Sequence, residues 1–156
     1  MTFENDPLFA FLDYVRAFEE GLAHSEWGGV RARLADDARY QVRGPVPFAC
    51  EVEGADAVVA AFERSVSGFD RKVEQRRLEI RSVARLPGDR VVAELHAGYR
   101  RSGAPAVEFP VSVEARLTGG RIAEMTDDYD GARCSAALEW FAAHGEGLDP
   151  RYLHEE

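Results

Sequence analysis

The stretch Gly119–Asp130, GGRIAEMTDDYD, contains a two-glycine turn, then a strand of alternating side chains, and then a cluster of carboxylates. Residues two apart in a strand point to the same face, so Asp127 shares a face with Met125 and Ala123. If that face is the inner one, Asp127 is a carboxylic acid aimed into an apolar interior. This placement is the strongest chemical signal in the sequence, although it identifies no substrate.

Before this stretch, the pattern of apolar residues changes from a helical period to a period of two near Val73. Helical spacing predicts three helices, over 7–24, over 25–34 with Ser25 as its cap, and over 55–68. Alternation predicts strands over 38–43, 73–86, 91–100, 107–117 and 121–128. The segment 44–54 contains two prolines and is expected to form a loop, while 131–144 is expected to form a closing helix carrying Leu138 and Phe141.

The order of these elements, helices first and then hairpin-linked strands, is typical of an α+β domain. A strongly bent, mostly antiparallel sheet packed on the N-terminal helices would form a cone with a pocket in its mouth. We expect one domain over 1–156, with its core at about 7–143 and a loose tail over 144–156.

The composition excludes several classes of partner. The chain has 156 residues, 46% of them hydrophobic, and a formal net charge of −9. This charge argues against nucleic acid and against an anionic membrane surface, because both attract basic proteins. Cys50 and Cys134 form no metal-binding or redox spacing. With no signal-peptide pattern and no apolar run of roughly 20 residues, a cytoplasmic location is expected.

Two local motifs, LADDARYQV (Leu34–Val42) and TGGRIAEMTDDYD (Thr118–Asp130), together with the element order over about 8–141, carry a family resemblance. The chain resembles the nuclear transport factor 2-like superfamily, in particular its SnoaL-like polyketide cyclases and limonene epoxide hydrolases. The resemblance implies that Asp127 acts as a general acid or base. It also implies that Tyr40 corresponds to a tyrosine that helps to hold the reacting water in the epoxide hydrolases.

The chain departs from each of these enzyme types. The arginine and aspartate that epoxide hydrolases pair on one strand correspond to Leu95 and Ala97, and their asparagine corresponds to Val42. The histidine of SnoaL-like cyclases corresponds to Val113. The tyrosine and two acids of ketosteroid isomerases correspond approximately to Phe18, Val42 and Val113. One acid, one phenol and an apolar wall remain.

Each candidate residue also has a structural interpretation. Asp127 could be solvated at the rim or accept backbone hydrogen bonds in the turn before the last helix. Asp127, Asp128 and Asp130 could suggest a metal site, but alternation sends Asp128 to the opposite face, so a solvated strand end with a helix N-cap fits better. Asp36 and Asp37 read as a polar turn. Inward-facing tyrosines such as Tyr40 usually satisfy their hydroxyl groups locally.

The leading hypothesis is a small, cofactor-independent cyclase, isomerase or hydrolase that acts on an apolar polyketide-like, terpenoid or steroid-like molecule. Asp127 would move the proton and Tyr40 would donate to a developing oxyanion. The remaining predicted site residues would bind substrate: Tyr14, Phe18, Trp27, Val42, Phe62, Leu95, Ala97, Tyr99, Phe109, Val111, Val113 and Met125. No metal ligand set is predicted.

The alternative is a non-catalytic ligand-binding or dimerisation module of the same fold, which the missing arginine, histidine and second acid favour. By analogy with the superfamily, a homodimer through the outer face of the sheet is plausible. The residues expected on that face, such as His96, Arg100 and Glu114, are polar for a buried interface.

Overall fold

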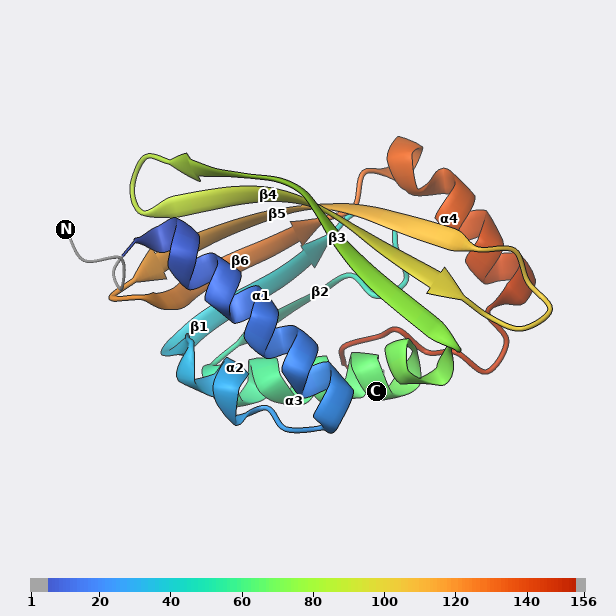
Figure 1. Cartoon of the computed structure of the whole chain (residues 1–156), viewed down its shortest axis with the longest axis horizontal. Coiled ribbons are helices and arrows are strands. Elements are labelled where there is room, and N and C mark those ends of the chain that lie inside the picture. Colours follow the sequence, from blue (N-terminus) through green and yellow to red (C-terminus); the bar gives the residue numbers. More distant parts are fainter. Residues whose placement is uncertain (1–5, 154–156) are drawn as a thin grey trace.

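The computed structural model describes residues 6–153 of the chain, and its strands form one six-stranded sheet (Figure 1). The order of the strands across the sheet is β2-β1-β6-β5-β4-β3. The helices and strands are α1 (Pro7–His24), α2 (Gly28–Ala32), β1 (Leu34–Arg43), β2 (Cys50–Glu53), α3 (Ala55–Gly68), the 3-10 turn η2 (Asp70–Lys72), β3 (Gln75–Leu86), β4 (Arg90–Arg100), β5 (Val107–Thr118), β6 (Arg121–Asp128) and α4 (Gly131–His144).

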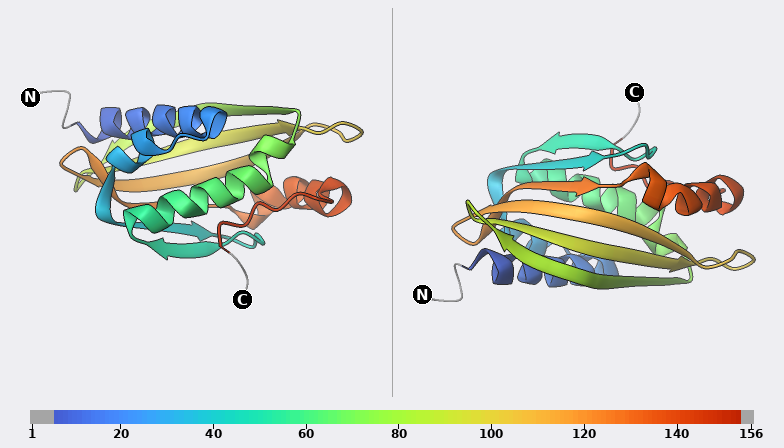
Figure 2. Two further views of the ribbon diagram at one scale, coloured as in Figure 1. Left: turned by 90° about the horizontal axis from the view of Figure 1, so that it is seen from below. Right: turned by 90° about the horizontal axis from the view of Figure 1, so that it is seen from above.

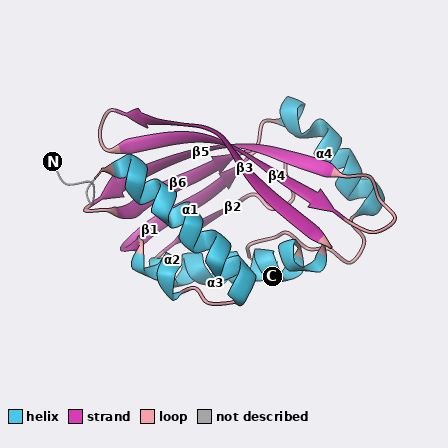
Figure 3. Cartoon of the chain, in the orientation of Figure 1, coloured by secondary structure: helices cyan, strands magenta, loops and turns pink. Residues whose placement is uncertain are grey.

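The sheet is mixed, because β1 and β6 are parallel while every other neighbouring pair is antiparallel (Figure 3). The β5–β6 hairpin turns through Gly119 and Gly120, whose φ angles are +58° and +79°. Two consecutive positive φ angles are typical of a two-residue type I′ turn, whose backbone twist suits the right-handed twist of the two strands that it joins. This hairpin brings β6 to the centre of the sheet, between β5 and β1. The predicted α+β cone with helices packed on a bent, mixed sheet is confirmed.

The side chains of β6 do not alternate regularly between the two faces of the sheet along the whole strand. Met125 and Ile122 are both buried although they lie three residues apart. The pairing with β5 shifts register between Arg116 and Leu117, so that an extra residue on β6 forms a bulge at Ala123. The expectation that Ala123 shares a face with Met125 and Asp127 is therefore wrong for Ala123, whose side chain is half-exposed.

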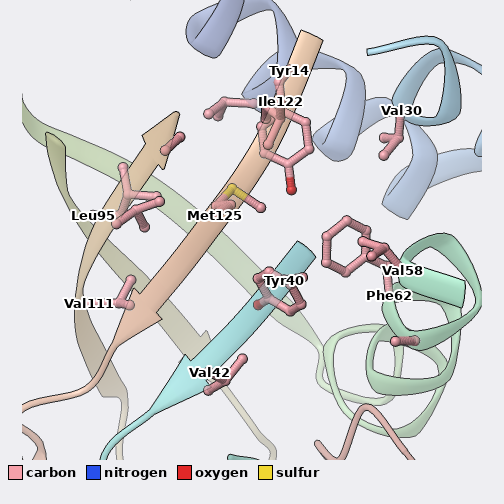
Figure 4. Packing of buried hydrophobic residues seen from close by; sticks show 14 of the residues in the cluster. Tyr14, Val30, Tyr40, Val42, Val58, Phe62, Leu95, Val111, Ile122 and Met125 are labelled. Atoms are coloured by element: carbon pink, nitrogen blue, oxygen red, sulfur yellow. The ribbon is translucent and has the colours of Figure 1, made fainter. Parts of the chain in front are cut away.

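Helices α1 and α3 cover the same face of the sheet, which Figure 2 shows from below and from above. The α1 helix begins as predicted, because Asp6 accepts a hydrogen bond from the Leu8 amide at 2.9 Å and Pro7 takes the first helical position. Its buried stripe includes Phe11 and Tyr14, and α3 contributes Phe62. Figure 4 shows Phe62 of α3 facing Tyr40 of β1 across the core.

The segment after α1 differs from its prediction. Ser25 does not cap a second helix, because it adopts a left-handed conformation with φ +57° and ends α1. The second helix, α2, spans only five residues, and Leu34 already belongs to β1. The expected polar turn at Asp36 and Asp37 is part of that strand, at a point where the register with β6 shifts.

The expected loop over 44–54 contains a short edge strand. Residues Cys50–Glu53 form β2, which pairs antiparallel with Arg39–Val42 of β1. The two prolines precede the strand, so they leave its ladder of hydrogen bonds intact. Phe48, just before β2, is buried against the sheet.

The closing helix α4 has the predicted bounds and is capped by Asp130, which accepts from the amides of Ala132 and Arg133. Its buried residues are Cys134, Ala137 and Trp140, whereas the predicted Leu138 and Phe141 are only half-buried. The cause is that α4 lies against the end of β5, where the Trp140 indole donates to the Pro105 carbonyl at 2.7 Å.

The C-terminal segment is not loose between Gly145 and Leu153. The Asp149 amide donates to the Gly68 carbonyl at 2.8 Å, and the Ser65 hydroxyl donates to the Pro150 carbonyl at 2.6 Å. The segment thus lies along the end of α3. Residues 154–156 of the expected tail lie outside the described part of the chain. Among the described residues, no helix combines the length and hydrophobicity needed to cross a membrane.

Candidate functional site

A cavity of about 130 Å³ lies between the inner face of the sheet and the helices α1 and α3. Alternation along β4 and β5 directs Leu95, Phe109 and Val111 toward it. Helix α1 contributes Tyr14 to the opposite wall, and Figure 4 shows this ring reaching toward Met125 of β6. The wall is therefore largely hydrocarbon and aromatic.

Asp127 lies near the end of β6 and faces this cavity. Its nearest strand neighbours are Val42 of β1 and Val113 of β5. Burial in these apolar surroundings raises the pKa of Asp127 from 3.8 to about 6, while the hydrogen bond from Tyr40 opposes the rise. Asp127 is thus neither a solvated rim residue nor the cap of α4, a position that Asp130 occupies.

Tyr40 lies on β1 one strand away, and its hydroxyl donates to Asp127 Oδ2 at 2.5 Å. This bond joins residues 87 positions apart in the sequence, and it exists because β1 and β6 are parallel neighbours. Burial, and then the negative charge of Asp127, raise the pKa of Tyr40 well above its usual value. The hydroxyl is already committed to the carboxylate, so it does not take the predicted position of a donor free for a substrate oxygen.

Four other tyrosines line the same cavity: Tyr14, Tyr99, Tyr129 and Tyr152. Burial and the nearby charge of Asp127 raise the pKa of Tyr14 well above its usual value, so that its hydroxyl keeps its proton. Among the described residues, the Tyr14 hydroxyl has no hydrogen-bond partner. It is therefore free to donate to a bound molecule.

Ten of the twelve predicted substrate-binding residues line the cavity: Tyr14, Phe18, Phe62, Leu95, Ala97, Tyr99, Phe109, Val111, Val113 and Met125. Trp27 and Val42 do not. The Trp27 ring packs behind Phe18 and Phe62, at centroid distances of 5.5 and 6.2 Å, and its indole donates to Glu63. Val42 is buried beside Asp127 in the sheet and does not line the cavity.

Sequence reasoning missed the groups that the chain brings to the cavity from turns and from the C-terminal segment. Phe69 and Asp70 follow α3, and Tyr152 lies at the end of the chain. Asp70 and Tyr152 lie in segments without a periodic pattern that marks an inward face, whereas Phe69 continues the apolar stripe of the preceding helix but was not predicted to line the cavity. For Arg76 a signal existed, because strand pairing sets it beside Tyr99, but the register shift between Ile80 and Ser82 of β3 could not be seen in the sequence.

A second polar cluster lies on the cavity wall and consists of Asp70, Arg76 and Tyr99. The Arg76 guanidinium donates through Nε to Asp70 Oδ2 at 2.6 Å and through Nη1 to Glu19 Oε1 at 2.6 Å. The Tyr99 hydroxyl donates to the same Asp70 oxygen at 3.1 Å. Burial raises the pKa of Asp70, and the charge of Arg76 opposes that rise.

Tyr152 narrows the cavity. Its ring lies 5.5 Å from that of Tyr40 and 6.4 Å from that of Phe48, measured between centroids. The volume of about 130 Å³ is close to that of engineered apolar cavities that take up one benzene ring. It lies below the roughly 300–1,000 Å³ of typical ligand pockets. A larger ligand therefore requires side chains of the wall to move, and the Tyr152 ring on the C-terminal segment is one of them.

Comparison with protein-family models matches residues 15–125 to the SnoaL-like domain. A comparison with curated protein sequences finds no match. The matched range contains Tyr40 and most of the cavity wall, and it ends two residues before Asp127.

Solved structures share the fold at low sequence identity. A putative isomerase from Rhodopseudomonas palustris has a TM-score of 0.66 at 16% identity, covering 83% of this chain and 96% of that one. An epoxide hydrolase of M. tuberculosis, similar to limonene epoxide hydrolase, has a TM-score of 0.60 at 20% identity, covering 88% and 93%. A protein of ketosteroid isomerase-like fold from Catenulispora acidiphila, in complex with trimethylamine, has a TM-score of 0.59 at 19% identity, covering 80% and 90%.

Proposed function

Because the chain belongs to the SnoaL-like domain family, we propose that it is a cofactor-independent enzyme that transfers a proton on a small, mostly apolar organic molecule. Asp127 is the proposed general base. The observation that carries the proposal is the Asp127 carboxylate, which faces a hydrocarbon-walled cavity and has a pKa of about 6. A base of this pKa is largely ionised at pH 7 and more basic than a solvated aspartate, which suits proton abstraction near neutral pH.

The proposed reaction begins at a carbon next to a carbonyl group. Asp127 takes the proton, the C–H electron pair moves into the C–C bond, and negative charge develops on the carbonyl oxygen. Tyr14 donates a hydrogen bond to that oxygen, while Tyr40 holds the carboxylate in place. Where the substrate has a C=C bond next to that carbon, return of the proton from Asp127 to the far end of that bond gives an isomer. Alternatively, the enolate carbon attacks a second carbonyl carbon of the same molecule, and the alkoxide that forms takes the proton back from Asp127, which gives a ring.

Two cavity residues favour this chemistry over epoxide hydrolysis. Leu95 and Ala97 stand where the resemblance places the arginine and aspartate of limonene epoxide hydrolases, and both line the cavity. Aliphatic side chains can neither protonate an epoxide oxygen nor position water. Isomerisation and cyclisation require only the base, the donor and an apolar wall.

Hydrogen exchange of 2-tetralone in D₂O, followed by NMR, tests the proposal. This bicyclic ketone has acidic protons next to its carbonyl, and a general base in the cavity exchanges them for deuterium. We expect the protein to accelerate exchange and Asp127→Asn to lose that acceleration by 10²-fold or more. Asp128→Asn is the matched control, because Asp128 is the next residue on β6 and is exposed on the opposite face.

The rival function, a non-catalytic binding module, gives a different result in the same experiment. The aliphatic side chains of Leu95, Ala97 and Val113, at the places where the resemblance sets catalytic groups, favour this rival. If 2-tetralone raises the unfolding temperature of the wild-type protein without faster exchange, the cavity binds ligands but does not enolise them. Equal acceleration by wild type and Asp127→Asn would remove Asp127 from the mechanism.

A further inference from the structure

The cavity has polar groups at two separate places on its wall. Asp127 lies level with Val113 of β5, which pairs with Ala93 of β4. Tyr99 is six residues further along β4, which corresponds to about 20 Å in an extended strand. The curvature of the sheet shortens the distance through the cavity, and Tyr152 lies near both groups, because the pKa of its hydroxyl is raised by burial and also by the charges of Asp127 and Asp70.

Between these two places the wall is aromatic. The Tyr99 ring contacts that of Phe109 at 5.9 Å, and Phe109 contacts Phe48 at 6.4 Å. Phe48 is in turn 6.4 Å from Tyr152, next to Tyr40. An elongated molecule with a flat apolar middle fits such a surface, with one polar group reaching each end.

The charges in the polar cluster determine which chemical group of a ligand can bind there. The cluster consists of Asp70, Arg76 and Tyr99 together with Glu19. Two carboxylates share one guanidinium, since Arg76 donates to both Asp70 and Glu19. The cluster thus carries no surplus positive charge, and a second anion would meet Asp70 across a poorly hydrated cavity. Arg76 and Asp70 are each only 11% exposed through their side chains, so solvent screens them weakly.

The cluster still has hydrogen-bonding capacity toward the cavity. The Arg76 Nη2 group has no partner among the described residues, whereas Nε and Nη1 are both used. Asp70 uses Oδ2 for both Arg76 and Tyr99. A hydroxyl group matches this pattern, because it can donate to the carboxylate and accept from the guanidinium.

We infer that the Asp70–Arg76–Tyr99 cluster is a second substrate-binding subsite, which takes a neutral hydroxyl at the end of the substrate remote from the reacting carbon. This inference rests on the proposed function, because it assigns the other end of the same molecule to Asp127. It narrows the substrate class to elongated aromatic or alicyclic compounds with a distal hydroxyl, and it disfavours a distal carboxylate.

Fluorescence titration with three biphenyl probes tests the inference. The probes are 4-phenylphenol, 4,4′-dihydroxybiphenyl and 4′-hydroxybiphenyl-4-carboxylic acid. We expect the diol to bind about tenfold more tightly than the mono-phenol, which is the value of one hydrogen bond to a charged group. The carboxylate should bind more weakly than the mono-phenol. Each titration is repeated in Tyr152→Ala, so that the ring of Tyr152 cannot block the two-ring probes.

Two variants assign the effect to the cluster. Asp70→Asn keeps the shape of the side chain and removes its charge, so the diol should lose most of its advantage while 4-phenylphenol binds as before. Tyr99→Phe removes only the hydroxyl that donates to Asp70. It replaces Asp70→Asn in the titrations if Asp70→Asn does not fold. Asp36→Asn changes an exposed aspartate on β1 and should retain the full advantage.

The results separate this inference from the proposed function. If the diol and the mono-phenol bind equally well in both wild type and Tyr152→Ala, the cluster is only a structural ion-pair network and the inference is overturned. Tighter binding of the carboxylate than of the diol would also overturn it. Neither result affects the 2-tetralone exchange, which depends on Asp127 with Tyr14 and Tyr40 and not on the cluster.

Discussion

Asp127 is held in a place where ionisation is costly. Apolar side chains of β5 and β6 surround its carboxyl group, and the phenol of Tyr40 is the partner that stabilises the charge. For such a group, function and stability oppose each other, because the surroundings that strengthen the base also penalise its ionised form.

This opposition predicts a pH-dependent difference in stability between wild type and Asp127→Asn. The pKa of Asp127 is 3.8 in the unfolded chain and about 6 in the folded one, so the folded protein binds the proton more tightly. Wild-type stability is then lost as the pH rises from about 4 to about 6, whereas asparagine does not titrate. From pH 4 to pH 7, the variant should gain about 2 kcal/mol in unfolding free energy relative to wild type.

Urea denaturation at several pH values measures this difference. The exposed Asp128→Asn variant should follow the wild-type curve. A constant difference between Asp127→Asn and wild type across this pH range would mean that Asp127 titrates alike in both states, and the buried base would not exist.

At the level of single residues, the sequence predicted that Asp127 faces inward, because the alternation of side chains from Met125 onward is regular in β6. It missed Asp70 because that residue lies in the η2 turn, where no period assigns a face. The sequence could not show what the Tyr40 hydroxyl contacts, because that depends on how two strands far apart in the sequence pair. Only the parallel pairing of β1 with β6 shows that its hydroxyl contacts the carboxylate.

Among the elements, the C-terminal segment has the most direct effect on the site. Its backbone bonds to the end of α3 place Tyr152 on the cavity wall. Gly68 makes this approach possible, since a Cβ atom there would lie 2.0 Å from the Asp149 carbonyl oxygen. Any side chain at position 68 must therefore displace the segment.

Gly68→Ala should lower the free energy of unfolding by about 1–3 kcal/mol, as is typical of an overpacked contact. It should also speed release of the C-terminal residues by trypsin, detected by mass spectrometry of the truncated product. Gly28→Ala is the matched control, because a Cβ there meets no atom within 4 Å. Equal cleavage of Gly68→Ala and wild type would show that the segment is not held at Gly68.

The helices and strands that the sequence predicted well are those with long, regular patterns. The β4 and β5 strands alternate over their whole length, and α1 has both a capping residue and a continuous stripe. The β2 strand is only four residues long and lies at the sheet edge, too short for a period to emerge. The C-terminal segment was expected to be loose because its contacts are mainly backbone hydrogen bonds, which leave little trace in sequence.

At the scale of the whole molecule, the fold limits the function without deciding it. A cone of this kind is shared by a putative isomerase and an epoxide hydrolase at 20% identity or less. Function therefore depends on which side chains the cone turns inward. Here these are one carboxylic acid with its phenol partner, a second phenol on α1, and a second polar cluster elsewhere on the aromatic wall.

The central claim is that the Asp127 carboxyl faces the cavity and titrates near neutral pH. A ¹³C NMR titration of protein labelled at aspartate carboxyl carbons measures this directly, with the Asp127 signal assigned by its loss in Asp127→Asn. The account predicts a midpoint at about pH 6 and a change in that signal when 4-phenylphenol binds. A midpoint near 4, with no response to the ligand, would contradict it.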